Sequence, residues 1–235
     1  MARAAVLTKV RRAVGLLLHT QRAQYVRRPD RSWVEILDFA FTFAHGFLRP
    51  GQVRSEIREA MEVIEAVQPK VLVEIGTAGG GNLFLLSRAA HANAYLASVD
   101  LPAGHSGGGY QAWKIPVFRR LLLKGQRADF LRADSHDPST LEELKRLLQG
   151  KLIDVLFIDG DHSYAGVKQD FELYSKLVRP GGLVLFHDIA HHPPADDCHV
   201  DQLWAELRPR YQGREFIENT DQGWAGIGLI RMPRD

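Results

Sequence analysis

Apolar residues between positions 71 and 188 form five short continuous runs, and each run stops at a polar or acidic residue. Segments whose apolar residues recur at helical spacing lie between the runs. Strands that are apolar throughout and alternate with helices predict an α/β fold with a parallel sheet covered on both faces. The runs, with their polar ends, are 71–75 (Glu74, then glycines), 95–99 (Asp100), 130–131 (near Asp134), 155–158 (Asp159) and 183–186 (His187 and Asp188).

Helices are expected before, between and after these strands. Residues 33–47 are apolar and aromatic, which predicts a helix that covers another part of the chain, and Pro50-Gly51 then breaks the chain. We therefore expect a basic, helical extension over residues 1–49 and one α/β domain over residues 50–235. The other expected elements are helices around 57–64 (closed by Pro69), at 83–90, 141–148 and 167–178 and around 203–207, and strands at 215–217 and 227–230.

The polar residues at the strand ends are expected to meet. The carboxyl ends of parallel strands lie along one edge of a sheet, and open α/β sheets bind ligands at that edge, where the strand order reverses. One crevice there should collect the carboxylates of Glu74, Asp100, Asp134, Asp159 and Asp188. This convergence is the main indication of a ligand site.

A glycine-rich turn, EIGTAGGGN, occupies residues 74–82 after the first strand. Glycines allow positive φ and close approach of a ligand, and backbone N–H groups at a helix start can hold an anion. The turn alone also fits a dinucleotide, but Ala78 stands where a pyrophosphate needs a second glycine. Asp100 can accept hydrogen bonds from both ribose hydroxyls, or it can serve as a turn or helix-capping acid.

Composition narrows the class of protein. The chain has 235 residues, of which 25% are charged, and its formal net charge of +2 is too small to suggest a dedicated nucleic-acid-binding protein. Cys198 is the only cysteine, which excludes an internal disulfide and indicates a reducing cytoplasm.

Positive charge is concentrated in residues 1–31, which contain eight Lys and Arg residues and one acidic residue, Asp30. The apolar run at 14–18 is far shorter than the ~20 residues of a membrane span, and it lacks a signal-peptide cleavage pattern. A basic helix of this kind can rest on an anionic membrane surface, but we favour a solvated arm or a subunit contact. The apolar segment 33–47 could make contacts between subunits of a homo-oligomer, so the sequence does not decide the oligomeric state.

Four longer motifs then follow in a recognisable order: VLVEIGTAGGGN, ASVDLP, FLRADSHDP and IDVLFIDGDHSYAGVKQDFELYSKLVRPGGLVLFHDI. Together they resemble the class I S-adenosylmethionine-dependent methyltransferases. More narrowly they are similar to the family that includes cephalosporin-hydroxylase-like proteins and macrolide-sugar O-methyltransferases. The resemblance covers about residues 50–230. It implies a Rossmann-like, seven-stranded, mostly parallel sheet whose last strand enters antiparallel, and S-adenosylmethionine as cofactor.

The resemblance also implies the residues of the cofactor site. Those expected near the methionine part are Glu74, Gly76, Gly80 and Asn82, with Asp100 on the ribose, Asp134 and Ser135 beside adenine, and Thr77, Ala78 and Asp159 completing the set.

Asp159, His187 and Asp188 are expected to bind a divalent metal. Two carboxylates with a third ligand form part of an octahedral Mg²⁺ site, and the metal-dependent relatives carry ligands at these three positions. His187 departs from the acid expected there, and an imidazole favours Mn²⁺, Fe²⁺ or Zn²⁺, so the identity of the metal stays open. The alternative is that Asp159 orders its loop, His187 packs at the sheet edge, and no ion binds.

His162 is expected to act as the general base beside Asp159, because an imidazole with a pKa of about 6.5 suits removal of a hydroxyl proton. The alternative is a loop histidine without this duty. The predicted function is therefore methyl transfer to a hydroxyl of a small molecule, such as a sugar or natural product. Two alternatives remain: a nucleotide-binding domain that serves regulation or assembly, and, less favoured, an NAD-dependent oxidoreductase.

Overall fold

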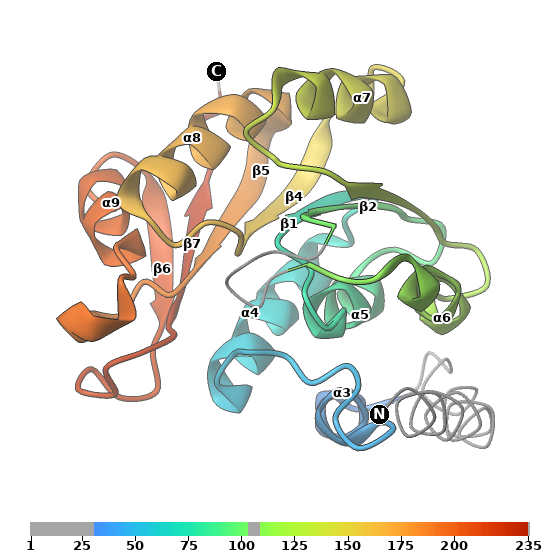
Figure 1. Ribbon diagram of the computed structural model, residues 1–235, viewed down its shortest axis with the longest axis horizontal. Coiled ribbons are helices and arrows are strands. Elements are labelled where there is room, and N and C mark those ends of the chain that lie inside the picture. Colours follow the sequence, from blue (N-terminus) through green and yellow to red (C-terminus); the bar gives the residue numbers. More distant parts are fainter. Residues whose placement is uncertain (1–30, 103–108, 235) are drawn as a thin grey trace, which may run out of the picture.

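The computed structural model describes residues 31–102 and 109–234, in which seven strands form one sheet in the order β3-β2-β1-β4-β5-β7-β6 (Figure 1). Neighbouring strands from β3 to β5 pair in parallel, whereas β7 is antiparallel to both β5 and β6. The strands are β1 (Val71–Ile75), β2 (Tyr95–Asp100), β3 (Arg127–Arg132), β4 (Ile153–Ile158), β5 (Val178–His187), β6 (Gln212–Phe216) and β7 (Ile227–Arg231).

Helices cover both faces of the sheet. Figure 1 shows α3, α4, α5 and α6 on one side and α7, α8 and α9 on the other. The α-helices are α3 (Trp33–Thr42), α4 (Arg54–Val67), α5 (Gly81–Ala89), α6 (Ile115–Leu121), α7 (Pro138–Leu148), α8 (Tyr164–Tyr174) and α9 (Val200–Leu207), and the short 3₁₀ helices are η1 (Ala112–Lys114), η2 (Ser175–Leu177) and η3 (Pro194–Asp196).

Two hydrophobic cores lie against the two faces of the sheet. Strand β1 contributes to both, since Leu72 belongs to the core under α3, α4 and α5, while Val73 and Ile75 belong to the core under α7, α8 and α9. All five residues of β1 are buried. Such strands, buried on both faces, explain the continuous apolar runs of the sequence.

The predicted Rossmann-like, seven-stranded and mostly parallel sheet with helices on both faces is confirmed. The strand order reverses between β1 and β4, which are neighbours in the sheet but not in the chain. The carboxyl ends of β1, β2 and β4 therefore surround the point where such sheets bind ligands.

Several element boundaries differ from the predicted ones. The helix expected over residues 33–47 ends at Thr42, because Ala44, His45 and Gly46 have positive φ. The helix expected over residues 167–178 ends at Tyr174, and Val178 instead pairs with Ile153 in the sheet. Helix α6 was not predicted, because its short sequence follows a glycine-rich loop.

Helix α3 packs into the same core as the sheet. Ser32 and Glu35 form a reciprocal capping box that begins the helix. Phe39 stacks on Phe43 at 4.6 Å and lies 5.1 Å from the ring of Phe84 in α5. The division into an extension (1–49) and a domain (50–235) stays a prediction.

The basic arm expected at the amino end, with its possible membrane-surface contact, lies outside the described residues. Among the residues that are described, none of the helices combines the length and the apolar character that a membrane crossing requires.

Candidate cofactor and active site

The glycine turn after β1 is shaped by close contacts with the neighbouring strand. Gly76 has φ +85°, and a Cβ atom at this position would overlap the carbonyl of Asp159. Gly80 also has φ +85° as the residue before α5, and a Cβ there would meet the ring of Phe118. Only glycine satisfies both the backbone conformation and the lack of space at these two positions.

Asp100 holds this turn in place. Its Oδ2 accepts hydrogen bonds from the backbone N–H groups of Thr77 (2.9 Å) and Ala78 (2.7 Å), and its Oδ1 accepts one from Leu101 (2.8 Å). Burial raises the pKa of Asp100, although these donors act in the opposite direction. Oδ1 keeps a further lone pair, so the predicted contact with a ribose is compatible with the turn-organising role.

Glu74 is buried beneath the turn. Its Oε2 accepts a hydrogen bond from the Thr77 hydroxyl at 2.7 Å, and that hydroxyl also contacts Ser98 Oγ at 2.6 Å. Ser98 continues the chain to the hydroxyl of Tyr110 at 3.2 Å. Burial raises the pKa of Glu74 well above its ordinary value. This network ties β1 and β2 to the segment that follows residues 103–108.

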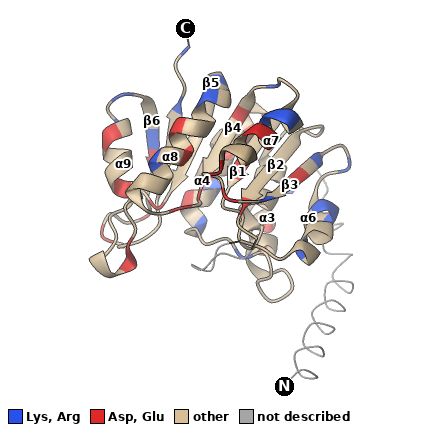
Figure 2. Cartoon of the chain, turned by 45° about the horizontal axis from the view of Figure 1, so that its top comes forward, with Lys and Arg blue, Asp and Glu red and all other residues tan. Residues whose placement is uncertain are grey.

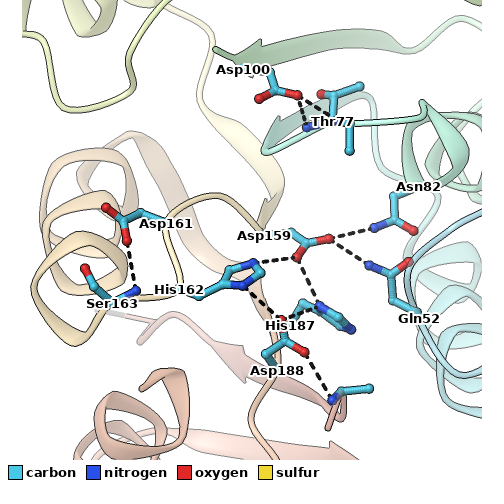
Figure 3. A network of polar contacts seen from close by, with 12 residues as sticks. Gln52, Thr77, Asn82, Asp100, Asp159, Asp161, His162, Ser163, His187 and Asp188 are labelled. Atoms are coloured by element: carbon cyan, nitrogen blue, oxygen red, sulfur yellow. Dashed lines mark hydrogen bonds and ion pairs between the residues drawn. The ribbon is translucent and has the colours of Figure 1, made fainter. Parts of the chain in front are cut away.

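Asp159 lies at the centre of the site (Figure 3). Its Oδ2 accepts hydrogen bonds from Gln52 Nε2 at 2.7 Å and Asn82 Nδ2 at 3.2 Å, and its Oδ1 lies 3.0 Å from His187 Nδ1. Burial disfavours the charged carboxylate, but the imidazoles of His187 and His162 outweigh it and lower the pKa of Asp159 to about 2.

Three buried oxygens around Asp159 and the turn have no hydrogen-bond partner among the described residues: Gln52 Oε1, Asn82 Oδ1 and Glu74 Oε1. The amide orientations follow from Asp159, because a carboxylate can only accept and must face the NH₂ groups. Buried acceptors that lack a donor are unfavourable. They indicate that a ligand with N–H or O–H groups completes this part of the site.

His187 stands between two carboxylates. Its Nδ1 lies 3.0 Å from Asp159 Oδ1 and 3.1 Å from Asp188 Oδ2. Burial alone would lower the pKa of this imidazole, but the two carboxylates raise it to about 10. Asp188 adopts φ +61° and accepts a hydrogen bond from the backbone N–H of Ala225 at 3.1 Å.

These three side chains fit a divalent cation. One ligand atom from each of Asp159, His187 and Asp188 lies within 4.8 Å of the others. Adjacent ligands of an octahedral ion with bonds of about 2.1 Å lie about 3 Å apart, which matches the two nitrogen–oxygen separations. One imidazole with two carboxylates suits Mn²⁺, Fe²⁺ or Zn²⁺ better than Mg²⁺.

His162 lies beside the same carboxylates but closer to solvent, with 45% of its side chain exposed. Its Nε2 is 3.7 Å from Asp159 Oδ1, and its Nδ1 is 3.5 Å from Asp188 Oδ2. The interaction with Asp159 raises the pKa of His162. Ser163, the next residue, caps the start of α8. The capped helix start therefore fixes the backbone position of His162.

Of the predicted site residues, Asp134 and Ser135 lie farther along the edge, after β3. The carboxylate of Asp134 is exposed and accepts from the backbone N–H of His136, and the carbonyl of Ser135 accepts from the Tyr174 hydroxyl. Neither contact tests the predicted role beside adenine.

Sequence reasoning missed several contributors to the site. Gln52 precedes the recognisable motifs, and Ser98 lies inside the ASVDLP motif but was not assigned to the site. Tyr110 and His192 were not assigned either, although His192 Nε2 contacts Asp188 Oδ1 at 3.3 Å. Cys198 was not assigned to the site either, yet it lies close to His162 and Asp188.

A cavity lined by arginines lies away from the candidate site. Figure 2 shows acidic segments in the loops around the site, whereas basic segments lie near the C-terminal end of the chain. There Arg210, Arg231 and Arg234 line a cavity of about 640 Å³. Strand β7 begins at Ile227, which pairs with His187 at the site, and ends at Arg231 at the opposite edge of the sheet, so this cavity is separate from the candidate site.

Comparison with solved structures identifies the fold as that of the methyltransferases. The chain is similar to the O-methyltransferase TomG of Streptomyces achromogenes in complex with S-adenosylmethionine, with a TM-score of 0.59 and 20% identity over 85% of this chain and 90% of that one. It is also similar to an O-methyltransferase of Bacillus cereus in complex with S-adenosylhomocysteine, with a TM-score of 0.53 and 15% identity over 92% and 99%.

The family model of a methyltransferase domain matches residues 73–189, from β1 to the end of the His187-Asp188 segment. Residues 73–189 are therefore a methyltransferase domain, and the fold is that of the class I S-adenosylmethionine-dependent methyltransferases. It is 36% identical over 116 residues to an uncharacterised protein of Acanthamoeba polyphaga mimivirus, covering 49% of this chain. The chain spans 50% of that relative's length and 16% of the length of another curated relative, an uncharacterised protein of Sinorhizobium fredii.

Proposed function

We propose that the chain transfers the methyl group of S-adenosylmethionine to a hydroxyl oxygen of a small molecule, such as a sugar or natural product. The observation that carries this proposal is the position of His162, a half-exposed imidazole beside Asp159 and Asp188 at the sheet edge that also bears the glycine turn. The proposal places a base and a cofactor site next to each other.

The cofactor would lie over the glycine turn. Asp100 would accept from the ribose hydroxyls, and Asp134 and Ser135 would flank adenine, as in the family that the sequence resembles. The unpartnered oxygens of Glu74 and Asn82 would accept from the methionine ammonium group. The remaining cofactor contacts would come from Gly76, Thr77, Ala78, Gly80 and Asp159.

In the reaction, the acceptor oxygen attacks the methyl carbon, the carbon–sulfur bond breaks, and S-adenosylhomocysteine leaves. A ring nitrogen of His162 takes the hydroxyl proton, a contribution of about 10²–10⁴ in rate. Asp159 and Asp188 hold the imidazole from both sides and stabilise it when it is protonated. Alignment of the oxygen with the methyl group supplies much of the remaining acceleration.

Asp159, His187 and Asp188 would hold a divalent cation, which would lower the pKa of a bound hydroxyl and position it. The single cysteine fits a reducing compartment, so we propose the cytoplasm as the location of the reaction.

Calorimetry with S-adenosylhomocysteine and with NAD tests the cofactor. We expect the first to bind and the second not to bind; binding of NAD alone would refute the proposal in favour of an oxidoreductase. If S-adenosylhomocysteine binds but no methyl transfer to any hydroxylated acceptor is found, a regulatory nucleotide-binding domain becomes the better interpretation.

Asp159→Ala tests the catalytic centre. We expect methyl transfer to fall at least 100-fold while S-adenosylhomocysteine still binds, with an affinity lowered by the loss of one contact. Asp161→Ala is the matched control, because Asp161 lies two residues away and its carboxylate accepts the backbone N–H of Ser163. Full activity after exhaustive chelation would remove the metal from the proposal and leave methyl transfer intact.

A further inference from the structure

Cys198, His162 and Asp188 form a second group of metal-ligating side chains. One ligand atom from each residue lies within 4.8 Å of the other two. Asp188 is shared with the cluster of Asp159 and His187, but the cysteine and His162 are not. Both Asp188 and Cys198 are buried, whereas His162 is exposed, so the group is open to solvent on one side.

The fold holds the cysteine in this position. Cys198 lies in the loop between η3 and α9, directly after Asp197, which has φ +48°. The next residue, His199, donates its backbone N–H to the carbonyl of His162 at 2.8 Å. This hydrogen bond joins the loop before α8 to the loop before α9, and it keeps the cysteine beside the imidazole.

The donor set favours a thiophilic cation. A thiolate, an imidazole and a carboxylate are the ligands of Zn²⁺, typically with bonds of about 2.0–2.3 Å in a tetrahedral arrangement. Ligands of such an ion lie about 3.3–3.7 Å apart. The 3.5 Å separation between His162 Nδ1 and Asp188 Oδ2 falls within that range, and the open side leaves a fourth position for water.

We propose that His162, Asp188 and Cys198 form a second cation site that takes Zn²⁺ or a similar thiophilic ion and thereby blocks the active site. The inhibitory part rests on the proposed function, because a cation on His162 occupies the nitrogen lone pair that would otherwise accept the hydroxyl proton. The binding part stands without it.

Titration with Co²⁺ tests the binding directly. A tetrahedral cobalt ion bound to a thiolate shows a sulfur-to-metal charge-transfer band in the near ultraviolet. Because the chain has one cysteine, this band can arise only from Cys198. We expect the band in the wild-type protein at one ion per chain and expect it to vanish in Cys198→Ser and Cys198→Ala, with circular dichroism verifying that both variants fold.

Two further variants make this titration specific. His162→Gln should weaken the band by removing the second ligand, whereas His191→Ala should leave it unchanged, because His191 is an exposed histidine that bonds Asp201 instead. Absence of the charge-transfer band in the wild-type protein overturns the site. A band that survives His162→Gln at full affinity also overturns it, since the thiolate would then bind cobalt without these partners.

Inhibition is measured as the Zn²⁺ concentration that halves methyl transfer, each protein being compared with its own rate without zinc. We expect this concentration to rise at least tenfold in Cys198→Ser, and an unchanged value would refute the inhibitory role. A charge-transfer band in a protein without any methyl transfer would refute the proposed function but retain the cation site. Methyl transfer in a protein that shows no charge-transfer band would refute the cation site but retain the proposed function.

Discussion

At the residue scale, Asp159 links the side of the site proposed for the cofactor to the side proposed for the acceptor. Its Oδ2 receives the amides of Gln52 and Asn82, while its Oδ1 faces the two imidazoles. A carboxylate that is saturated with donors in this way stays ionised despite its burial, because each donor favours the charged form. The same contacts aim the amide oxygens of Gln52 and Asn82 away from Asp159.

Gln52→Ala is expected to weaken binding of S-adenosylhomocysteine about tenfold, since it removes an acceptor for the ligand and a donor that orients Asp159. Calorimetry measures the change. Gln68→Ala is the matched control, because Gln68 lies at the other end of α4, where its amide donates to the carbonyl of Glu65. Equal affinity in the Gln52 variant and the wild-type protein would show that the unpartnered amide oxygen does not face the cofactor.

At the element scale, the loop between β3 and α7 is fastened to α8 by His136. Its Nε2 lies 3.4 Å from Asp170 Oδ1, a fully buried carboxylate, and 3.2 Å from the carbonyl of Gly166. The interaction with Asp170 raises the pKa of His136 to about 9. The Asp170 carboxylate has no hydrogen bond of standard geometry among the described residues. The positive charge of His136 is therefore the main interaction that offsets the burial of this carboxylate.

The folded-state pKa of His136 exceeds the value of about 6.5 expected in the unfolded chain. Its stabilising effect is therefore complete below pH 6.5 and is lost as the pH rises through about 9. We expect His136→Gln to lower the free energy of unfolding by about 2 kcal/mol at pH 6 and by much less at pH 9.5. Urea unfolding at both values measures the difference; a loss independent of pH would contradict the ion pair. His191→Gln is the control, because His191 forms an exposed pair.

The turn between β1 and α5 gives a second prediction at this scale. Gly76→Ala is expected to cost on the order of 3 kcal/mol, because the methyl group meets the backbone of Asp159 in addition to the unfavourable positive φ. Gly150→Ala has a similar φ of +77° but open space around it, so it should cost only about 1 kcal/mol. Equal losses in urea unfolding would show that the contact with β4 is not what requires glycine.

Sequence patterns predicted the strands well where the residues of a strand are buried on both faces of the sheet. Strands β1, β2 and β4 are buried along almost their whole length, so the apolar runs marked them well. The ends of helices were less predictable. Residues 43–47 continue the apolar pattern of α3, but positive φ at Ala44 and His45 ends the helix, and this conformation leaves no apolar signature.

The candidate site was predictable only where it coincides with a motif. Asp159, His187 and Asp188 come together as expected from strands that are adjacent in the sheet. Gln52 reaches Asp159 across 107 residues of chain, and Cys198 reaches His162 through a loop hydrogen bond. Contacts of this kind depend on how helices and loops pack over the sheet edge, which hydrophobic periodicity does not encode.

At the scale of the whole molecule, the glycine turn after β1 depends on the segment that precedes the recognisable domain. Phe39 of α3 packs against Phe84 of α5, and a Cβ at Gly81, the first residue of α5, would overlap the carbonyl of Leu48. Residues 33–50 thus cover the start of α5, where the cofactor is proposed to bind. This packing predicts that the segment unfolds together with the sheet.

Phe39→Ala tests that prediction. The side chain is buried, so its removal is expected to cost about 3–5 kcal/mol. If residues 33–49 and the sheet form one cooperative unit, urea unfolding followed by circular dichroism and by tryptophan fluorescence will show one coincident transition, shifted to lower urea in the variant. Val34→Ala, at an exposed position of the same helix, should leave the midpoint unchanged. A main transition that is insensitive to Phe39→Ala would instead identify this segment as an independent appendage.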